Sequence, residues 1–162
     1  MCEIRKLLVT PAFFSTEERV RQWRTEEYEE NTAYPETRRF ETEQGEIVRS
    51  KSEVIIANLL YHNKDKILYK YERPLEVYAN GYKRVYHPDF TILNVKTGRM
   101  VYWEHAGRMD DPRYASDFVR RMNVYTSNGL KLGRDILVTF ETQEEPLDIV
   151  QVRKIVEELC RG

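Results

Sequence analysis

The sequence lacks several features that would assign a protein to a special class. It has only two cysteines in 162 residues, and no apolar run approaches the roughly eighteen residues that a membrane-spanning helix needs. The N-terminus lacks the charged-then-apolar pattern of a secretory signal peptide, and we find no internal repeat, low-complexity tract or linker. These absences argue against membrane, secreted and repeat proteins, and we expect one domain over residues 1–162.

Neither the cysteines nor the net charge indicates a particular kind of site. Cys2 and Cys160 lie near opposite ends of the chain and match no metal-ligand spacing. We interpret them as reduced thiols of an intracellular, cytoplasmic protein, while a bridge between them stays open. The net charge of -1 gives no overall signature of nucleic-acid binding. An enzyme can still present one basic face, with its acidic residues neutralised by a metal ion.

The composition supports a substantial core, because 41% of the residues are hydrophobic and 12% are aromatic. Residues 1–44 are expected to form an N-terminal helix and a polar connector, and residues 45–162 the core. The core order is α-β-β-β-α-β, followed by a last helix, and it predicts a three-layer α/β/α fold around a mixed four-stranded sheet. The expected helices span about 15–30, 51–62, 112–127 and 147–159, and the strands 68–78, 83–93, 99–106 and 135–141.

Local signals set these boundaries. Ser15 and Glu18 form a capping-box pattern at the first helix. Asn80-Gly81 is a strong hairpin signal between the first two strands, and the glycine-containing segment 94–98 joins the second strand to the third. The second and third strands should therefore lie side by side.

Three carboxylates lie in elements that the predicted fold brings close together. Glu53 opens the helix at 51–62, Asp89 lies in the second strand, and Glu104 lies in the third. Strand alternation puts Asp89 and Glu104 on one face of the hairpin. Unpaired buried carboxylates are costly and repel each other unless a cation bridges them. Mg²⁺ or Mn²⁺ would suit such oxygen ligands, and the main-chain carbonyl of His105 could complete the metal shell.

Each acid also has a purely structural interpretation. Glu53 fits the third position of a capping box with Ser50, and Asp89 could be a hydrogen-bonding residue at a strand end. Glu104 in an apolar strand is harder to explain by structure alone. The His105 side chain should pack on the opposite face, and Glu141 is expected to be a surface residue.

This pattern resembles the PD-(D/E)XK nuclease superfamily, with its restriction-endonuclease-like fold. The resemblance covers about residues 45–142, through the helix with Glu53, the pair Pro88-Asp89 and the strand with Glu104. It implies that Glu53, Asp89 and Glu104 bind metal in a nuclease that hydrolyses DNA, or alternatively RNA. The sequence is similar to an uncharacterised bacterial branch of that superfamily.

The chain departs from the family pattern at one important position. The family places a lysine two residues after the second acid, where this chain has Ala106. We rank Lys51 first as a relocated cation, followed by Arg121 and Lys70. Arg108, Arg113, Arg120 and Arg121 are candidate phosphate contacts, although such a charge run is also typical of a solvated helix face.

The sequence thus favours a Mg²⁺-dependent nuclease acting on DNA. A nuclease-like module that binds nucleic acid or protein without cleavage is the alternative, and Ala106 favours it. A role on the same fold that does not involve nucleic acid is a further alternative, in keeping with the balanced charge. The oligomeric state stays open, with a homodimer among the options.

Overall fold

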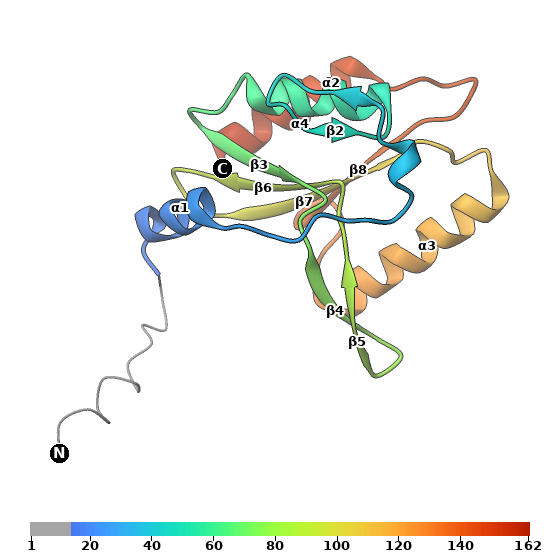
Figure 1. Cartoon of the computed structure of the whole chain (residues 1–162), viewed down its shortest axis with the longest axis horizontal. Coiled ribbons are helices and arrows are strands. Elements are labelled where there is room, and N and C mark those ends of the chain that lie inside the picture. The colour runs from blue at the N-terminus through green and yellow to red at the C-terminus, as the bar shows by residue number, and fades with distance from the viewer. Residues whose placement is uncertain (1–13) are drawn as a thin grey trace.

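The computed structural model describes residues 14–162 and is built around a mixed four-stranded sheet in the order β3-β6-β7-β8 (Figure 1). β3 (Ile67–Tyr71) pairs antiparallel with β6 (Phe90–Asn94), and β6 pairs antiparallel with β7 (Met100–Ala106). β8 (Ile136–Phe140) joins β7 in parallel after a helical crossover. The predicted mixed four-stranded sheet is therefore confirmed.

Helices cover both faces of this sheet. α2 (Lys51–Tyr61) and α4 (Ile149–Arg161) pack on one face, and α3 (Pro112–Ser127) packs on the other (Figure 1). α1 (Thr16–Thr25) lies on the α3 side, since its Trp23 packs against Lys70, which points away from the α2 face. The three-layer α/β/α fold expected from the sequence is confirmed.

The apolar core is divided by the sheet into two clusters. Strand alternation sends every second residue of β3 and β6 toward α2 and α4, where Trp103 is fully buried. The cluster on the opposite face packs Phe118, Met122 and Tyr125 of α3 against the sheet. Two ordered layers of this kind fix the ends of β6 and β7 between α2 and α3.

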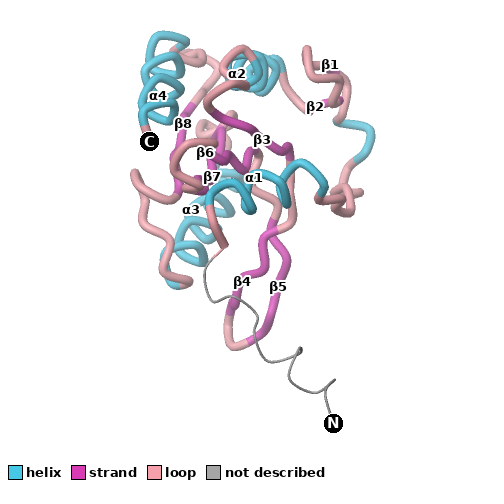
Figure 2. Tube along the Cα trace, turned by 90° about the vertical axis from the view of Figure 1, so that its left-hand side faces the viewer, coloured by secondary structure: helices cyan, strands magenta, loops and turns pink. Residues whose placement is uncertain are grey.

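The predicted hairpin at Asn80-Gly81 is present, but it belongs to a separate two-stranded sheet. β4 (Leu75–Ala79) pairs antiparallel with β5 (Tyr82–Tyr86), and both turn residues have positive φ. The hairpin projects away from the central sheet in both views (Figures 1 and 2).

The prediction of two long strands, 68–78 and 83–93, was wrong in one respect, because each strand is broken in the middle. Residues 72–74 and 87–89 leave the ladder between the β3–β6 and β4–β5 pairs. Glu72 has a positive φ of 47°, and Pro74 and Pro88 have no N–H group to donate. Asp89 consequently sits in a bend immediately before β6 and not within a strand.

Smaller differences concern the other boundaries. The N-terminal helix ends at Thr25 and not near residue 30, although Ser15 caps it as predicted. The last helix starts at Ile149, where Asp148 supplies the N-cap, and runs to Arg161. The 3₁₀ turn η1 (Pro35–Thr37) and the short antiparallel pair β1 (Phe40–Glu41) and β2 (Ile47–Val48) were not predicted. Cys2 lies outside the described residues.

Candidate active site

Asp89 and Glu104 face each other across the end of the β6–β7 ladder. Phe90 is paired with Trp103, so the next step of the antiparallel register sets Asp89 opposite Glu104. The backbone N–H of His105 donates to Asp89 Oδ2 at 2.6 Å. The structure therefore brings these two acids together, as alternation along the strands suggests.

Glu104 is the most deeply buried of the acids, with 1% of its surface exposed. Its carboxylate points toward α3, where the Tyr125 hydroxyl donates to Oε1 at 2.6 Å and Arg121 Nη1 donates to Oε2 at 3.1 Å. Burial raises the pKa of Glu104, against the opposing effects of Arg121 and Tyr125. The strand thus presents one acid to an α3 face that carries a cation and a hydroxyl.

Glu53 reaches the site from the first turn of α2. It completes a capping box, because its Oε2 accepts from the N–H groups of Arg49 at 2.8 Å and Ser50 at 2.7 Å. Tyr71 donates its hydroxyl to Oε1 at the longer distance of 3.4 Å. Burial raises the pKa of Glu53, although the two backbone donors lower it. The capping role weighed from the sequence is therefore present in the structure.

The three acids, Glu53, Asp89 and Glu104, share one electrostatic neighbourhood, which we call the three-acid site. Burial raises the pKa of Asp89 well above its ordinary value of 3.8, and the charges of Glu104 and Glu53 raise it further. Like charges this close disfavour each other's ionised form unless a cation is shared. The site therefore favours uptake of either a proton or a cation.

Of the candidate cations, the structure brings only Arg121 into contact with one of the three acids, within the described residues. Burial opposes its charge, but Glu104 and Asp89 outweigh this effect and raise the pKa of Arg121. Lys51 is an exposed residue at the start of α2. Lys70 instead pairs with Glu26 at 2.6 Å, on the side of the sheet covered by α1.

The remaining candidate phosphate contacts lie along the exposed surface of α3 and the loop before it. Arg108 pairs with Asp111 at 2.5 Å, and Arg120 pairs with Asp117 at 2.9 Å. Arg113 is exposed in the first turn of the helix. Such pairs between exposed side chains break at little cost, so these arginines are free to exchange partners.

The His105 side chain lies on the opposite face from Glu104, as alternation predicts. Its Nδ1 lies 3.0 Å from Thr139 Oγ1, and its Nε2 lies 2.9 Å from Glu141 Oε2. Burial lowers the pKa of His105, although Glu141 opposes that effect. The His105 carbonyl accepts from the Tyr114 hydroxyl at 3.5 Å, a long contact.

Glu141, for which the sequence favours a surface position but leaves a place beside the site open, links two elements of the site. Besides His105, it accepts a hydrogen bond from Ser52 Oγ at 2.6 Å. Ser52 immediately precedes Glu53, so this bond ties the start of α2 to the end of β8. The position of Glu53 is thereby fixed relative to β7.

Sequence reasoning missed the hydroxyl and carboxylate partners around the acids. Tyr125 lies four residues after Arg121, which places both on one face of α3. That spacing was a usable signal once Glu104 was placed opposite the helix. Tyr71, the last residue of β3, and the buried Glu72, the first residue of the unpredicted break, gave no signal.

The carboxylates of the three-acid site determine which metal ion could bind there. Within residues 14–162, no three side chains of the types His, Cys, Asp and Glu form a group that could hold a metal ion. Mg²⁺, however, is commonly bound by one or two carboxylates, with waters and substrate phosphate completing its shell. Asp89 and Glu104 supply that smaller set, and their carboxylate oxygens have spare lone pairs. The donor chemistry therefore fits Mg²⁺ or Mn²⁺.

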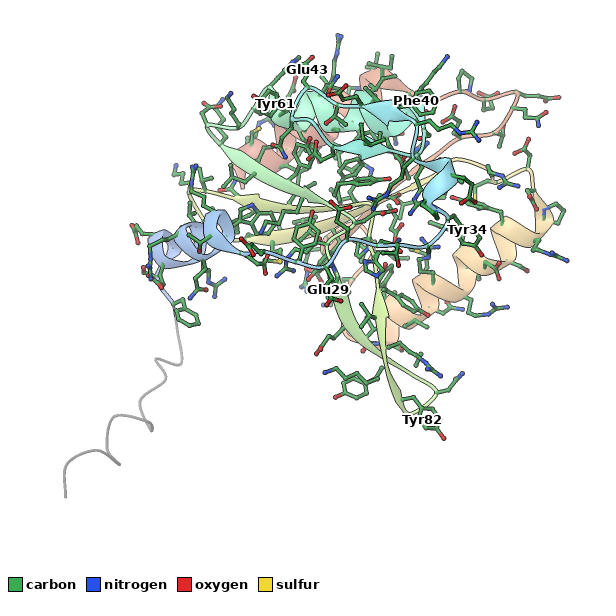
Figure 3. The ribbon with its side chains drawn as sticks, in the orientation of Figure 1. Glu29, Tyr34, Phe40, Glu43, Tyr61 and Tyr82 are labelled. Carbon is green, nitrogen blue, oxygen red and sulfur yellow. The ribbon has the colours of Figure 1, made fainter. Side chains whose placement is uncertain are left out.

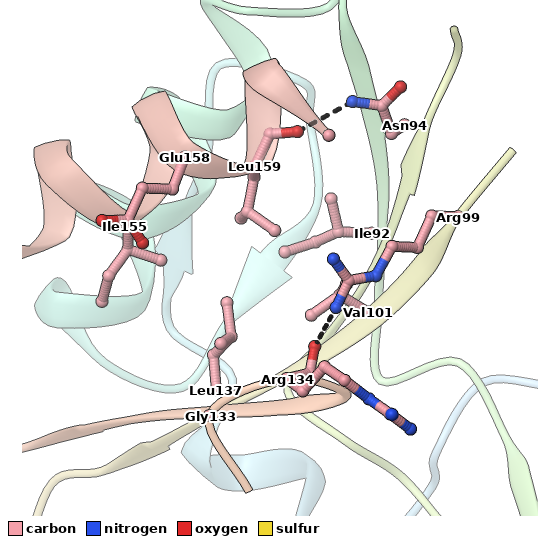
Figure 4. A pocket seen from close by; sticks show the side chains of 11 residues that line it. Ile92, Asn94, Arg99, Val101, Gly133, Arg134, Leu137, Ile155, Glu158 and Leu159 are labelled. Atoms are coloured by element: carbon pink, nitrogen blue, oxygen red, sulfur yellow. Dashed lines mark hydrogen bonds between the residues drawn. The ribbon is translucent and has the colours of Figure 1, made fainter. Parts of the chain in front are cut away.

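Two cavities in the described part of the chain are lined by none of the three acids. One, of about 120 Å³, lies between α4 and the sheet and is bounded by Asn94, Arg99 and Leu159 (Figure 4). Another, of about 390 Å³, is lined by Tyr28, Arg38 and Tyr71.

Comparisons with known proteins add no relative to this description. No known protein family matches the sequence, and no curated protein or solved structure is significantly similar to the chain. Among residues 14–162, no helix combines the length and apolar character that crossing a membrane requires.

Proposed function

We propose that the protein is a Mg²⁺-dependent nuclease that hydrolyses phosphodiester bonds of DNA. The observation that carries the proposal is that Asp89 lies opposite Glu104 at the end of the β6–β7 ladder, where burial and then the charge of Glu104 raise the pKa of Asp89. A shared cation relieves that repulsion. The order of elements around these acids resembles the PD-(D/E)XK superfamily, and the proposal includes membership of it.

The acids hold the metal in this proposal. Asp89 and Glu104 are the direct ligands, with Glu53 behind them at the start of α2 and the His105 carbonyl beside them. A bound Mg²⁺ would lower the pKa of an attacking water and neutralise charge on the scissile phosphate. Tyr125 fixes the orientation of Glu104 through its hydroxyl.

Arg121 supplies the positive charge that the family lysine would supply at position 106, where this chain has Ala106. Its guanidinium donates to Glu104, and the charge of Asp89 also stabilises it. The guanidinium would therefore lie beside a phosphate bound at these two acids. An arginine stays protonated throughout, which suits stabilisation of transition-state charge and excludes a role as a base. This assignment reverses the order expected from the sequence, so that Lys51 becomes the second candidate.

The same proposal covers setting and partners. DNA is the expected substrate, and the exposed arginines Arg108 and Arg113 are the expected phosphate contacts on α3. We place the protein in the bacterial cytoplasm, where its thiols stay reduced.

The direct test is cleavage of DNA by purified protein with Mg²⁺ or Mn²⁺, set against the same reaction in EDTA. Glu104→Gln keeps the shape of the side chain and an acceptor for Tyr125 or Arg121 but removes the charge. Cleavage should therefore be lost while the melting temperature changes little. Full activity in chelator, or in the Glu104→Gln variant, would end the proposal.

A binding module without cleavage is the second candidate. Two observations favour it, because Ala106 is fully buried and apolar, and Arg121 already neutralises Glu104 without a metal. Fluorescence anisotropy with labelled DNA separates the two. Retention of DNA without cleavage in Mn²⁺ supports the module, whereas cleavage supports the nuclease.

A further inference from the structure

Another buried carboxylate, outside the three-acid site, lies one residue beyond β3, in the break that carries Asp89. Glu72 has 4% of its surface exposed and adopts a left-handed backbone conformation with φ of 47°. Residues other than glycine rarely occupy this region, and they do so where surrounding structure enforces it. A charged, buried residue held there needs partners that stabilise it.

Two arginines supply those partners, and we call the three residues Arg38, Arg49 and Glu72 the Glu72 network. Arg38 Nη2 donates to Glu72 Oε2 at 2.5 Å, and Arg49 Nε donates to Oε1 at 2.7 Å. Burial opposes the charge of both arginines, but Glu72 outweighs it and raises their pKa. Buried ion networks add little net stability compared with well-packed apolar residues, so stability alone does not account for this one.

The backbone of the network reaches two of the three acids. The N–H of Arg49 donates to Glu53 Oε2 at 2.8 Å, and the N–H of Glu72 donates to the Asp89 carbonyl at 3.0 Å. The Glu72 carbonyl lies 3.0 Å from His87 Nδ1, from which it accepts. One ion pair, between Arg49 and Glu72, therefore connects Glu53 on α2 with Asp89 on the opposite side of the break.

Arg49 also ties the connector before the core to this point. Its guanidinium donates to the Ala33 carbonyl at 2.7 Å and to the Tyr34 carbonyl at 2.8 Å, and it bonds Thr37 Oγ1. Tyr34 has its own left-handed backbone, and its exposed ring projects at the η1 turn (Figure 3). Five donors in a planar fork are needed for this many acceptors, and a lysine offers no such geometry.

We propose that Arg49 and Glu72 are positioning residues of the active site, which hold Asp89 opposite Glu104 and keep Glu53 in place behind them. The proposal rests on the nuclease function but concerns residues outside the three-acid site. Neither residue touches the substrate or metal. The pair acts through two backbone hydrogen bonds, from the Arg49 N–H to the Glu53 carboxylate and from the Glu72 N–H to the Asp89 carbonyl.

Single and double variants separate positioning from simple stabilisation. Arg49→Met or Glu72→Gln alone breaks the ion pair and should lower the melting temperature, because a buried charge loses its partner. The double variant Arg49→Met/Glu72→Gln removes both charges and leaves an amide that accepts from Arg38. It should recover part of the melting temperature lost in the single variants, because Arg38 keeps an uncharged acceptor, while kcat stays at least about tenfold below the parent, as loss of geometry far from the chemistry costs rate.

The chain offers a control outside the break and the three-acid site. Arg134 Nη2 pairs with Asp135 Oδ2 at 2.7 Å, immediately before β8. Arg134→Met/Asp135→Asn removes this ion pair and should change stability without changing kcat. A rate loss in this control equal to that in the Arg49→Met/Glu72→Gln variant would show that any ion-pair loss impairs the enzyme, and would overturn the proposal.

A readout independent of activity completes the test. The His105 amide donates to Asp89 Oδ2 at 2.6 Å, so its proton chemical shift reports the position of Asp89 in metal-free protein. The shift should move in the Arg49→Met/Glu72→Gln variant and stay unchanged in the control. An unmoved His105 amide, or a rate that recovers together with stability, would overturn the proposal. If the parent cleaves no DNA, the nuclease function fails, and the amide shift alone decides whether Arg49 and Glu72 position Asp89.

Discussion

At the scale of single residues, the chemistry of the site depends on how Glu104 is neutralised. A carboxylate with 1% exposure cannot rely on water, so protein groups or a cation must balance its charge. The structure provides Tyr125 on one oxygen and Arg121 on the other. Arg121 thereby occupies the electrostatic place for which Lys51 was the first candidate from the sequence.

Arg121→Met is the variant that tests this assignment. Loss of a transition-state charge partner typically costs on the order of a hundredfold in rate, and we expect a loss of that size in kcat for DNA cleavage. Lys51→Met is the control, since Lys51 is exposed at the start of α2, and it should cut at nearly the parent rate. The reverse pattern would return the role to Lys51. Restoring the family lysine with Ala106→Lys in the Arg121→Met background should recover part of the rate if the buried position admits the longer side chain.

The periodicity of the strands was enough to predict which acids face each other, but contacts between distant elements could not be predicted from the sequence. The opposition of Asp89 and Glu104 follows from alternation along two paired strands. The contact between Arg121 and Glu104 depends on the rotation of α3 over the sheet, which no local pattern records. The partners of Glu72 come from residues 23 and 34 positions earlier in the chain, so spacing could not reveal them.

At the scale of elements, the break in the hairpin sets where Asp89 lies relative to Glu104. The apolar alternation of 68–78 and 83–93 predicts two continuous strands, and the turn at Asn80-Gly81 was confirmed. Pro74 and Pro88 were the available signals for a break, because each lacks the N–H that a ladder uses. The break puts Asp89, which is half-buried, immediately before the first residue of β6, while Glu104 is buried within β7.

The N-terminal cap of α2 gives the element-scale prediction. Ser50→Ala removes the hydroxyl that accepts from the Glu53 N–H and should lower the free energy of unfolding by about 1 kcal/mol in urea titrations. Asp148→Ala removes the corresponding cap of α4 and should cost a similar amount. Only Ser50→Ala should also reduce cleavage, because Glu53 shares the same capping box. Equal activity in the two variants would show that Glu53 does not depend on its cap.

At the scale of the whole molecule, the three-acid site lowers stability in the absence of a cation. Its acids come from α2, the bend before β6, and β7, so only the complete fold brings their charges together. The unfolded chain separates them and leaves each near its ordinary pKa. Folding therefore concentrates negative charge, in contrast to Glu26, whose pKa falls to about 2 because Arg73 binds it.

The last prediction concerns how pH and metal act on that stability. The folded pKa of Asp89 is raised above its ordinary value of 3.8, so the folded state binds more protons than the unfolded state above that pH. The contribution of Asp89 to the free energy of unfolding is thus most favourable below pH 3.8 and is lost as pH rises through the raised folded value. In metal-free protein, Asp89→Asn should remove this loss, so that its melting temperature at neutral pH equals or exceeds that of the parent. Millimolar Mn²⁺ should stabilise the parent, by about 2.7 kcal/mol at roughly a hundred times the dissociation constant, and the variant far less. The measurement is calorimetry of the parent and the Asp89→Asn variant side by side. If Mn²⁺ leaves the melting temperature of the parent unchanged, the three-acid site does not bind the metal.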